Sequence, residues 1–173
     1  MQWIAYRAKS LSLSHGAVLA NSEATRWIWE LDEAWQPARE ALERLLLAYD
    51  WGEAFAALNL VVKPTLDALF KRALAELATA HGDGLAAAML QESRVDTTRS
   101  QDWSAALVRY SIAADPANRR VLANWQAEWQ PLADRAVAGL ATIFATAPYP
   151  NEPAAVGLQV AASVSKFRSS FQL

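Results

Sequence analysis

Apolar side chains recur every three or four residues through most of the chain, and this spacing predicts helices. The clearest case follows Pro37, where the helical pattern includes Ala38, Ala41, Leu42, Leu45, Leu46 and Tyr49. Only 6 of the 173 residues are glycine, and no segment reads as a strand with a partner. The sequence therefore predicts an all-α fold, in one domain or a large piece of one.

Capping residues, prolines and turn residues set the ends of the expected helices. We expect helices at about residues 2–13, 22–32, 37–49, 51–80, 85–114, 116–143 and 156–171. Pro64 should kink the helix it interrupts, because it removes an amide that would bond the Leu60 carbonyl. Pro131 leaves two interpretations open, namely one helix kinked at Trp129-Gln130 or two helices sharing an apolar face.

Three prolines near the C-terminus suggest a division of the chain. Pro148, Pro150 and Pro153 mark a connector. We expect a helical domain over residues 1–147, followed over residues 148–173 by the connector and a weak final helix.

Composition excludes several kinds of chemistry. The chain has no cysteine, so disulfides, thiolate catalysis, iron–sulfur clusters and cysteine-based zinc sites are excluded. The net charge is −2, and Lys and Arg are scattered along the chain, so the sequence shows no basic patch that would bind nucleic acid. His15 and His81 lie in turns with no acidic residue three or four positions away, so we expect no metal ligands and no catalytic residues.

Nothing in the sequence indicates a membrane or export segment. The most apolar run, residues 54–62, is far too short to span a bilayer. The N-terminus lacks the layout of a signal peptide, so we expect a cytoplasmic protein.

The expected helix over residues 85–114 has an unusual apolar side. That side carries Leu85, Met89, Glu92, Asp96, Arg99, Trp103, Leu107 and Tyr110. Asp96 and Arg99 can pair along the helix, and a desolvated acid needs such a partner. The polar cluster is either a structural salt bridge near a helix crossing, which we favour, or a functional cluster.

The chain also has 8 tryptophans, which suit a core or a protein interface.

Several segments resemble one protein family. They are Ala5-Tyr6-Arg7, Asp50-Trp51-Gly52-Glu53-Ala54-Phe55, Leu58-Asn59-Leu60-Val61-Val62-Lys63-Pro64, Asp102-Trp103-Ser104-Ala105-Ala106-Leu107-Val108, Asn124-Trp125 and Trp129-Gln130-Pro131-Leu132-Ala133-Asp134-Arg135-Ala136. In this order they are similar to the β subunits of toluene, phenol and alkene monooxygenase hydroxylases. The resemblance covers roughly residues 1–145, and the tail after Tyr149 matches nothing.

The resemblance implies a ferritin-like helical bundle without a diiron site. It implies a non-catalytic structural β subunit within an NADH-dependent multicomponent monooxygenase acting on aromatic hydrocarbons, phenols or alkenes. In that family a partner α subunit carries the diiron cofactor, and α, β and γ subunits form a dimer of heterotrimers. A reductase and a small regulatory protein complete the system.

The resemblance also assigns roles to individual residues. Iron-binding relatives carry Asp-Glu-x-Arg-His where this chain has Asp96-Thr97-Thr98-Arg99-Ser100. Thr97 and Ser100 are therefore lost ligand positions, and Asp96 with Arg99 is the vestigial pair that would support ligands. The candidate interface or core residues are Trp51, Phe55, Leu58, Asn59, Trp103, Trp125 and Trp129.

Two further expectations complete the sequence-based account. A different function class, a freestanding helical protein-binding module without an enzyme role, stays open as the alternative.

Met1 falls just before Ala5-Tyr6-Arg7, inside what should be the second core helix of the family. We therefore expect the chain to lack N-terminal core helices, and the isolated chain to be oligomeric, molten or prone to aggregate.

Overall fold

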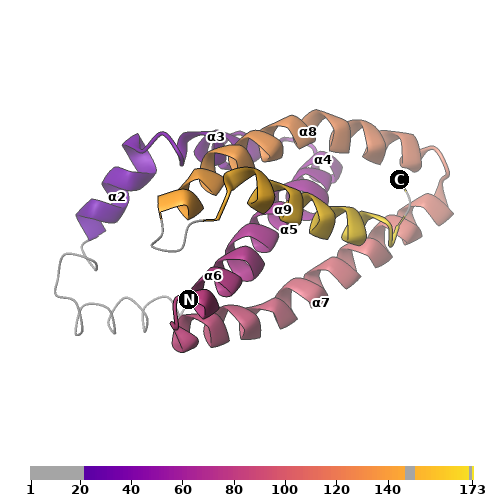
Figure 1. Ribbon diagram of the computed structural model, residues 1–173. Helices are drawn as coiled ribbons and strands as arrows, with labels where there is room; N and C mark the ends of the chain where they lie inside the picture. The colour runs from indigo at the N-terminus through magenta and orange to yellow at the C-terminus, as the bar shows by residue number, and fades with distance from the viewer. Residues whose placement is uncertain (1–21, 147–150, 172) are drawn as a thin grey trace.

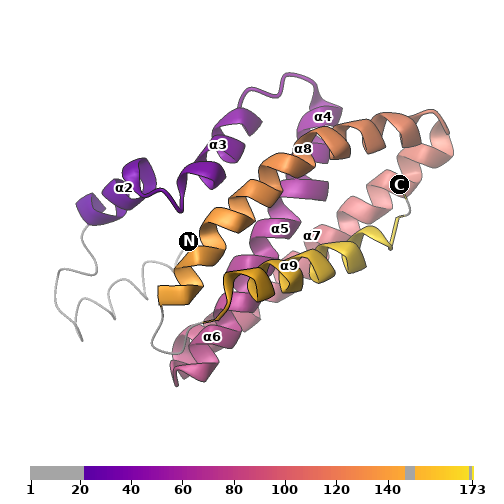
Figure 2. The same cartoon turned by 45° about the horizontal axis from the view of Figure 1, so that its top comes forward.

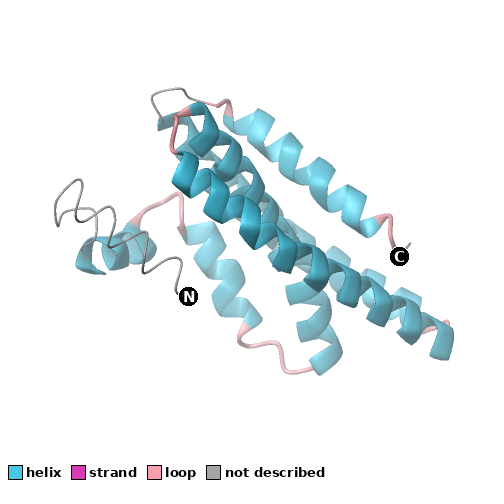
Figure 3. Cartoon of the chain, turned by 90° about the horizontal axis from the view of Figure 1, so that it is seen from below, coloured by secondary structure: helices cyan, strands magenta, loops and turns pink. Residues whose placement is uncertain are grey.

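The computed structural model describes residues 22–146, 151–171 and 173, which form helices joined by short loops, with no strand among them (Figure 3). The elements are α2 (Ser22–Leu31), α3 (Gln36–Leu45), α4 (Trp51–Phe55), η2 (Ala56–Val62), α5 (Lys63–Asp67), η3 (Ala68–Ala73), α6 (Leu74–Ala80), α7 (Gly84–Ala114), α8 (Asn118–Ala141), η4 (Thr142–Thr146) and α9 (Pro153–Arg168). The helix expected over residues 2–13 lies outside the described residues.

The segments from α4 to α6 follow one another along a single path (Figure 2). Two of them, η2 and η3, are π-helical, and such wide turns occur mostly as single insertions inside α-helices. Pro64 lies just after η2. Proline has no amide hydrogen to donate, and here it falls where the α-helical hydrogen-bond pattern has already changed to the π-helical one. The Thr65 hydroxyl donates to the Val61 carbonyl at 2.7 Å. A change of helix type thus accompanies Pro64, where the sequence predicted only a kink.

A tight turn reverses the chain between α6 and α7. Gly82 adopts a positive φ of 72°, which glycine tolerates without a steric penalty. The Asp83 side chain then accepts a hydrogen bond from the amide of Ala86 and caps α7. Consequently α7 returns alongside α6 and extends beyond it (Figure 1).

Helix α8 begins two residues later than expected and continues through Pro131. Asp115 accepts a hydrogen bond from the Ala117 amide at 2.9 Å and so closes a turn ahead of Asn118. Pro131 lies inside α8, so this segment is one helix rather than two.

The C-terminal helix α9 packs against α8, α5 and η3 (Figures 1 and 2). Its buried side chains are Val156, Val160, Val164 and Phe167, and Phe171 beyond its end is buried too. These residues join the same apolar clusters as Leu60, Leu69 and Trp129. The final helix is therefore part of the core, and its apolar spacing matches the sequence-based expectation for residues 156–171.

Among the described residues, no helix combines the length and apolar character that crossing a membrane would require.

Candidate subunit interface

Three aromatic rings form a continuous stack that joins α4 to α7. Trp51 stacks on Phe55 with ring centroids 5.8 Å apart, and Phe55 meets Trp103 edge-on at 5.7 Å. Phe55 is buried, whereas Trp51 is 71% exposed and Trp103 is 56% exposed. Tyr110, two helical turns beyond Trp103, is 73% exposed. We call Trp51, Phe55, Trp103 and Tyr110 the aromatic face.

The segment just before α4 adds further exposed apolar side chains. Leu46, Leu47 and Tyr49 follow α3, and all three are almost fully exposed. Leu58 on η2 is partly exposed as well. Large apolar side chains gathered on a surface mark a protein interaction site more often than single exposed residues do. The aromatic face and its neighbours thus have the composition of a docking surface, in which aromatic residues are enriched.

Local contacts explain why Trp51 stands at the start of a helix. The Asp50 carboxylate accepts hydrogen bonds from the amides of Gly52 and Glu53, at 2.7 and 3.0 Å. This is an N-cap, which satisfies amides that lack partners in the first turn. The cap fixes the beginning of α4, so the Trp51 side chain is held against Phe55 and next to solvent.

The tryptophans of α8 lie inside the fold and support α4 from the other side. Trp129 is buried, and its Nε1 donates to Oε1 of Glu53 at 3.1 Å. Trp125 is half-buried, and its ring lies so close to Gly52 that a Cβ there would be 2.9 Å from Cη2. Arg44 places its guanidinium 5.7 Å from the centre of the Trp129 ring. The stretch from Asp50 to Glu53 is therefore a junction between α4 and α8.

Sequence reasoning grouped seven residues as interface or core, and the structure separates them. Phe55 and Trp129 belong to the core, and Trp125 packs against it. Asn59 is half-buried, and its Nδ2 donates to the Phe55 carbonyl at 3.3 Å. The remaining three are exposed in the chain alone: Trp51, Leu58 and Trp103.

The structure corrects the expectation of a buried Asp96–Arg99 pair. Both side chains are exposed, and no ion pair joins them within the described chain. Glu92 is exposed too. The reason is that α7 turns its other face inward, where Ser104, Ala105 and Val108 are buried. Of the apolar side predicted for this helix, Leu85, Trp103 and Tyr110 are exposed, whereas Leu107 is partly buried against the core.

Thr97, which the resemblance assigns to a lost ligand position, lies in a network of charged groups. Its hydroxyl donates to Oδ2 of Asp67 and accepts from Nζ of Lys71, both at 3.0 Å. Asp67 also pairs with Lys63 at 2.6 Å and with Lys71 at 3.0 Å, and its side chain is 12% exposed. Two ammonium groups thus neutralise the carboxylate that contacts Thr97. This donor set repels a metal cation rather than holding one.

Ser100, the other residue that the resemblance assigns in this way, takes part in a contact within its own helix. Its carbonyl accepts the Ser104 hydroxyl at 2.7 Å within α7. Across the described residues, no three His, Cys, Asp or Glu side chains come together as a metal site would require.

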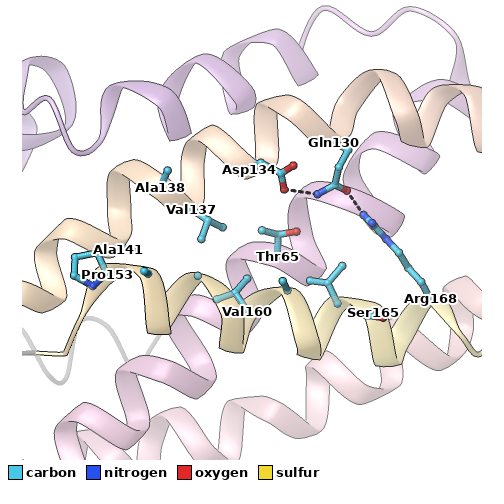
Figure 4. A pocket seen from close by; sticks show the side chains of 14 residues that line it. Thr65, Gln130, Asp134, Val137, Ala138, Ala141, Pro153, Val160, Ser165 and Arg168 are labelled. Carbon is cyan, nitrogen blue, oxygen red and sulfur yellow. Dashed lines mark hydrogen bonds between the residues drawn. The ribbon is translucent and has the colours of Figure 1, made fainter.

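A groove of about 520 Å³ between α8 and α9 was not expected from the sequence (Figure 4). At one end, Arg168 donates to Gln130, and Gln130 donates to Asp134. Burial lowers the pKa of the Arg168 guanidinium from its ordinary value, and the Asp134 carboxylate partly offsets this shift. The remaining lining is mainly alanine and valine, so the groove has an apolar floor and one polar end.

The chain is an all-helical protein whose aromatic face is exposed to solvent. Its described residues include no group of side chains that could hold a metal ion. A solved structure of toluene 4-monooxygenase with toluene in its resting active site has a similar chain, with a TM-score of 0.75 and 38% identity. That likeness covers 80% of this chain and 46% of the other. The fold is thus the helical, ferritin-like fold of that hydroxylase.

Sequence comparisons agree with the structural one. The Methane/Phenol/Alkene Hydroxylase family matches residues 1–115. The hydroxylase component subunit beta of the toluene-4-monooxygenase system of Ectopseudomonas mendocina is 39% identical over 140 residues, which are 79% of this chain and 42% of that protein. The hydroxylase component small subunit of propane 2-monooxygenase from Gordonia sp. strain TY-5 is 28% identical over 94% of this chain and 44% of its own length.

These findings confirm the resemblance noted from the motifs: the chain belongs to the Methane/Phenol/Alkene Hydroxylase family. Its relatives include hydroxylase β and small subunits of monooxygenase systems. The chain spans less than half the length of the relatives it matches.

Proposed function

We propose that this chain is a structural, non-catalytic part of a β-type hydroxylase subunit in a multicomponent monooxygenase. The observation that carries the proposal is the 39% identity to the β subunit of a toluene-4-monooxygenase system, over most of this chain. Identity at this level, combined with the same fold, favours the same place in the assembly. The substrate class would be aromatic hydrocarbons, phenols or alkenes.

We assign the oxidation chemistry to a partner α subunit holding a diiron centre, because the residues that the structure describes do not fit one. A bridged iron pair needs several carboxylates and imidazoles close together. The carboxylate that contacts Thr97, that of Asp67, is already paired with Lys63 and Lys71. An ammonium group beside the carboxylate opposes the approach of a divalent cation.

The role left for this chain is to support the partner subunit through the aromatic face. Trp51 and Trp103 are large, exposed and fixed in place by their contacts with buried Phe55. Side chains already held in one conformation lose little entropy when a partner covers them. We propose that the α subunit covers this surface, in a cytoplasmic assembly of α, β and γ subunits arranged as a dimer of heterotrimers and supplied with electrons from NADH.

Co-expression with a family α subunit tests the proposal. The parent chain should co-purify with the α subunit in equal amounts. Trp51→Ala combined with Trp103→Ala should reduce the co-purified fraction at least about tenfold, because buried aromatic anchors dominate interface energies. Leu158→Ala, which changes an exposed apolar residue on α9, is the matched control and should have no effect.

The same experiment separates this proposal from the alternative of a freestanding binding module. A freestanding module would not retain the α subunit under conditions that keep both proteins folded. Absence of any complex, with both partners soluble and cooperatively folded, would contradict the proposed function.

A further inference from the structure

A second surface, distinct from the aromatic face, lies between α7 and α9. It is a groove of about 330 Å³ whose floor comes from α5 and η3. Four cationic side chains line it, Lys71, Arg72, Arg94 and Lys166, and two carboxylates, Asp67 and Asp102. We call this the basic groove. Its excess of positive charge contrasts with the net charge of −2 on the whole chain.

The contacts inside the groove leave two of its cations without partners. The Asp67 carboxylate forms ion pairs with Lys63 and Lys71, and Arg72 forms one with Glu76 at 3.4 Å. Arg94 on α7 and Lys166 on α9 form no ion pair with any residue that the structure describes.

Both unpaired cations are exposed, so the groove opens to solvent between two helices. Two unpaired cations on facing helices raise the local potential, and a ligand with several negative charges would lower it.

We propose that the basic groove binds an acidic segment of a partner protein, with Arg94 and Lys166 contacting carboxylates from opposite walls. Hydroxyl and amide groups of Thr98, Gln101 and Ser170 also line the groove and can supply further polar contacts. The inference does not depend on the hydroxylase assignment, because it rests on the charges of this groove alone.

A carboxylate ligand suits the groove better than a nucleic acid does. Single-stranded nucleic acids bind through exposed aromatic rings on which bases stack. Phe167, the one aromatic residue that lines the groove, is buried and packs edge-on against Phe171 at 5.0 Å.

The test measures binding of a fluorescein-labelled octaglutamate peptide to the full chain by fluorescence anisotropy at low salt. The parent should bind, and added salt should weaken binding because exposed charges are screened. Arg94→Glu with Lys166→Glu should weaken binding about tenfold or more. The matched control Arg120→Glu reverses an exposed charge at the start of α8, outside the groove, and should change affinity less than about twofold.

Three results would overturn the proposal. They are no binding of octaglutamate to the parent chain, equal weakening by the Arg120 control, and tighter binding of a single-stranded DNA through the same two residues. If the double charge reversal disturbs folding, Arg94→Gln with Lys166→Gln replaces it. Unchanged affinity in that folded variant would also contradict the proposal.

Discussion

The hydroxyl of Thr97 donates to Oδ2 of Asp67 at 3.0 Å, and this hydrogen bond links α7 to α5. Lys71 completes the contact with an ammonium group 3.0 Å from both residues. A cross-link made of one carboxylate, two lysines and a hydroxyl therefore joins the helices where iron-binding relatives are expected to carry ligands.

Asp67→Asn should lower the free energy of unfolding by about 1–2 kcal/mol, because hydrogen bonds to a charged group are lost while the two lysines can still turn toward water. Thr97→Val should cost about 1 kcal/mol. Since the two residues share one interaction, the double variant should cost less than the sum of the single ones. Urea unfolding measures all three, with the exposed Asp102→Asn as a control that should be nearly neutral. Additive effects would show that the contact carries no stability.

The purified chain should bind no iron. Thr97 and Ser100 offer hydroxyl groups where relatives are expected to offer a carboxylate and an imidazole, and the nearby carboxylate of Asp67 is paired with two lysines. Metal analysis after incubation with ferrous iron and desalting should therefore give background levels. One or two tightly held irons per chain would refute this account of the site.

Gly52→Ala should destabilise the chain by about 1–3 kcal/mol, because overpacking forces the neighbouring groups to move. The new Cβ would be 2.9 Å from Cη2 of Trp125. Gly157→Ala on α9 is the matched control, since it meets nothing within 4 Å in a helix. The control should be neutral or stabilise by about 0.5–1 kcal/mol. Thermal unfolding compares the two, and equal effects would argue against the close approach of α4 and α8.

Phe55→Asp should abolish folding or assembly. Phe55 is buried between Trp51 and Trp103, and placing a carboxylate there adds an unpaired charge to the loss of about 1.5–3 kcal/mol of apolar burial. Circular dichroism and co-purification with the α subunit provide the measurement. A variant that folds and assembles as well as the parent would mean that the burial of this ring is misassigned.

The helical pattern of the sequence predicted most elements because each is encoded by nearby residues. Asp83 before α7, the turn at Gly82 and the valine spacing of α9 are all local signals. The start of α8 was predicted two residues early, because Asp115 closes a separate turn before the helix begins.

The direction in which α7 faces could not be predicted in this way. Its apolar spacing shows that one side of the helix avoids water, but spacing does not reveal whether the same chain or a partner covers that side. The structure buries the side that carries Ser104 and Val108 and leaves Trp103 and Tyr110 outside. The sequence-based prediction that Asp96 and Arg99 form a buried pair was wrong for the same reason, since both side chains are exposed.

Contacts between distant residues account for what sequence reasoning missed. Thr97 forms hydrogen bonds with Lys71 and Asp67, which are 26 and 30 residues away in the sequence. Arg168 forms one with Gln130, which is 38 residues away. No local spacing links such residues, so only the packing of helices brings them together. The motif from Asp50 to Glu53 was identified by resemblance, whereas its roles in capping α4 and contacting Trp129 required the structure.

Hydroxyl-radical footprinting with mass spectrometry tests the central claim most directly, because it reports the exposure of individual side chains. Oxidation of Trp51, Trp103 and Tyr110 should fall several-fold when the chain is bound to the α subunit, while that of exposed Leu158 on α9 should stay unchanged. Unchanged oxidation of the three aromatic residues in an intact complex would contradict the claim that this chain supports its partner through the aromatic face.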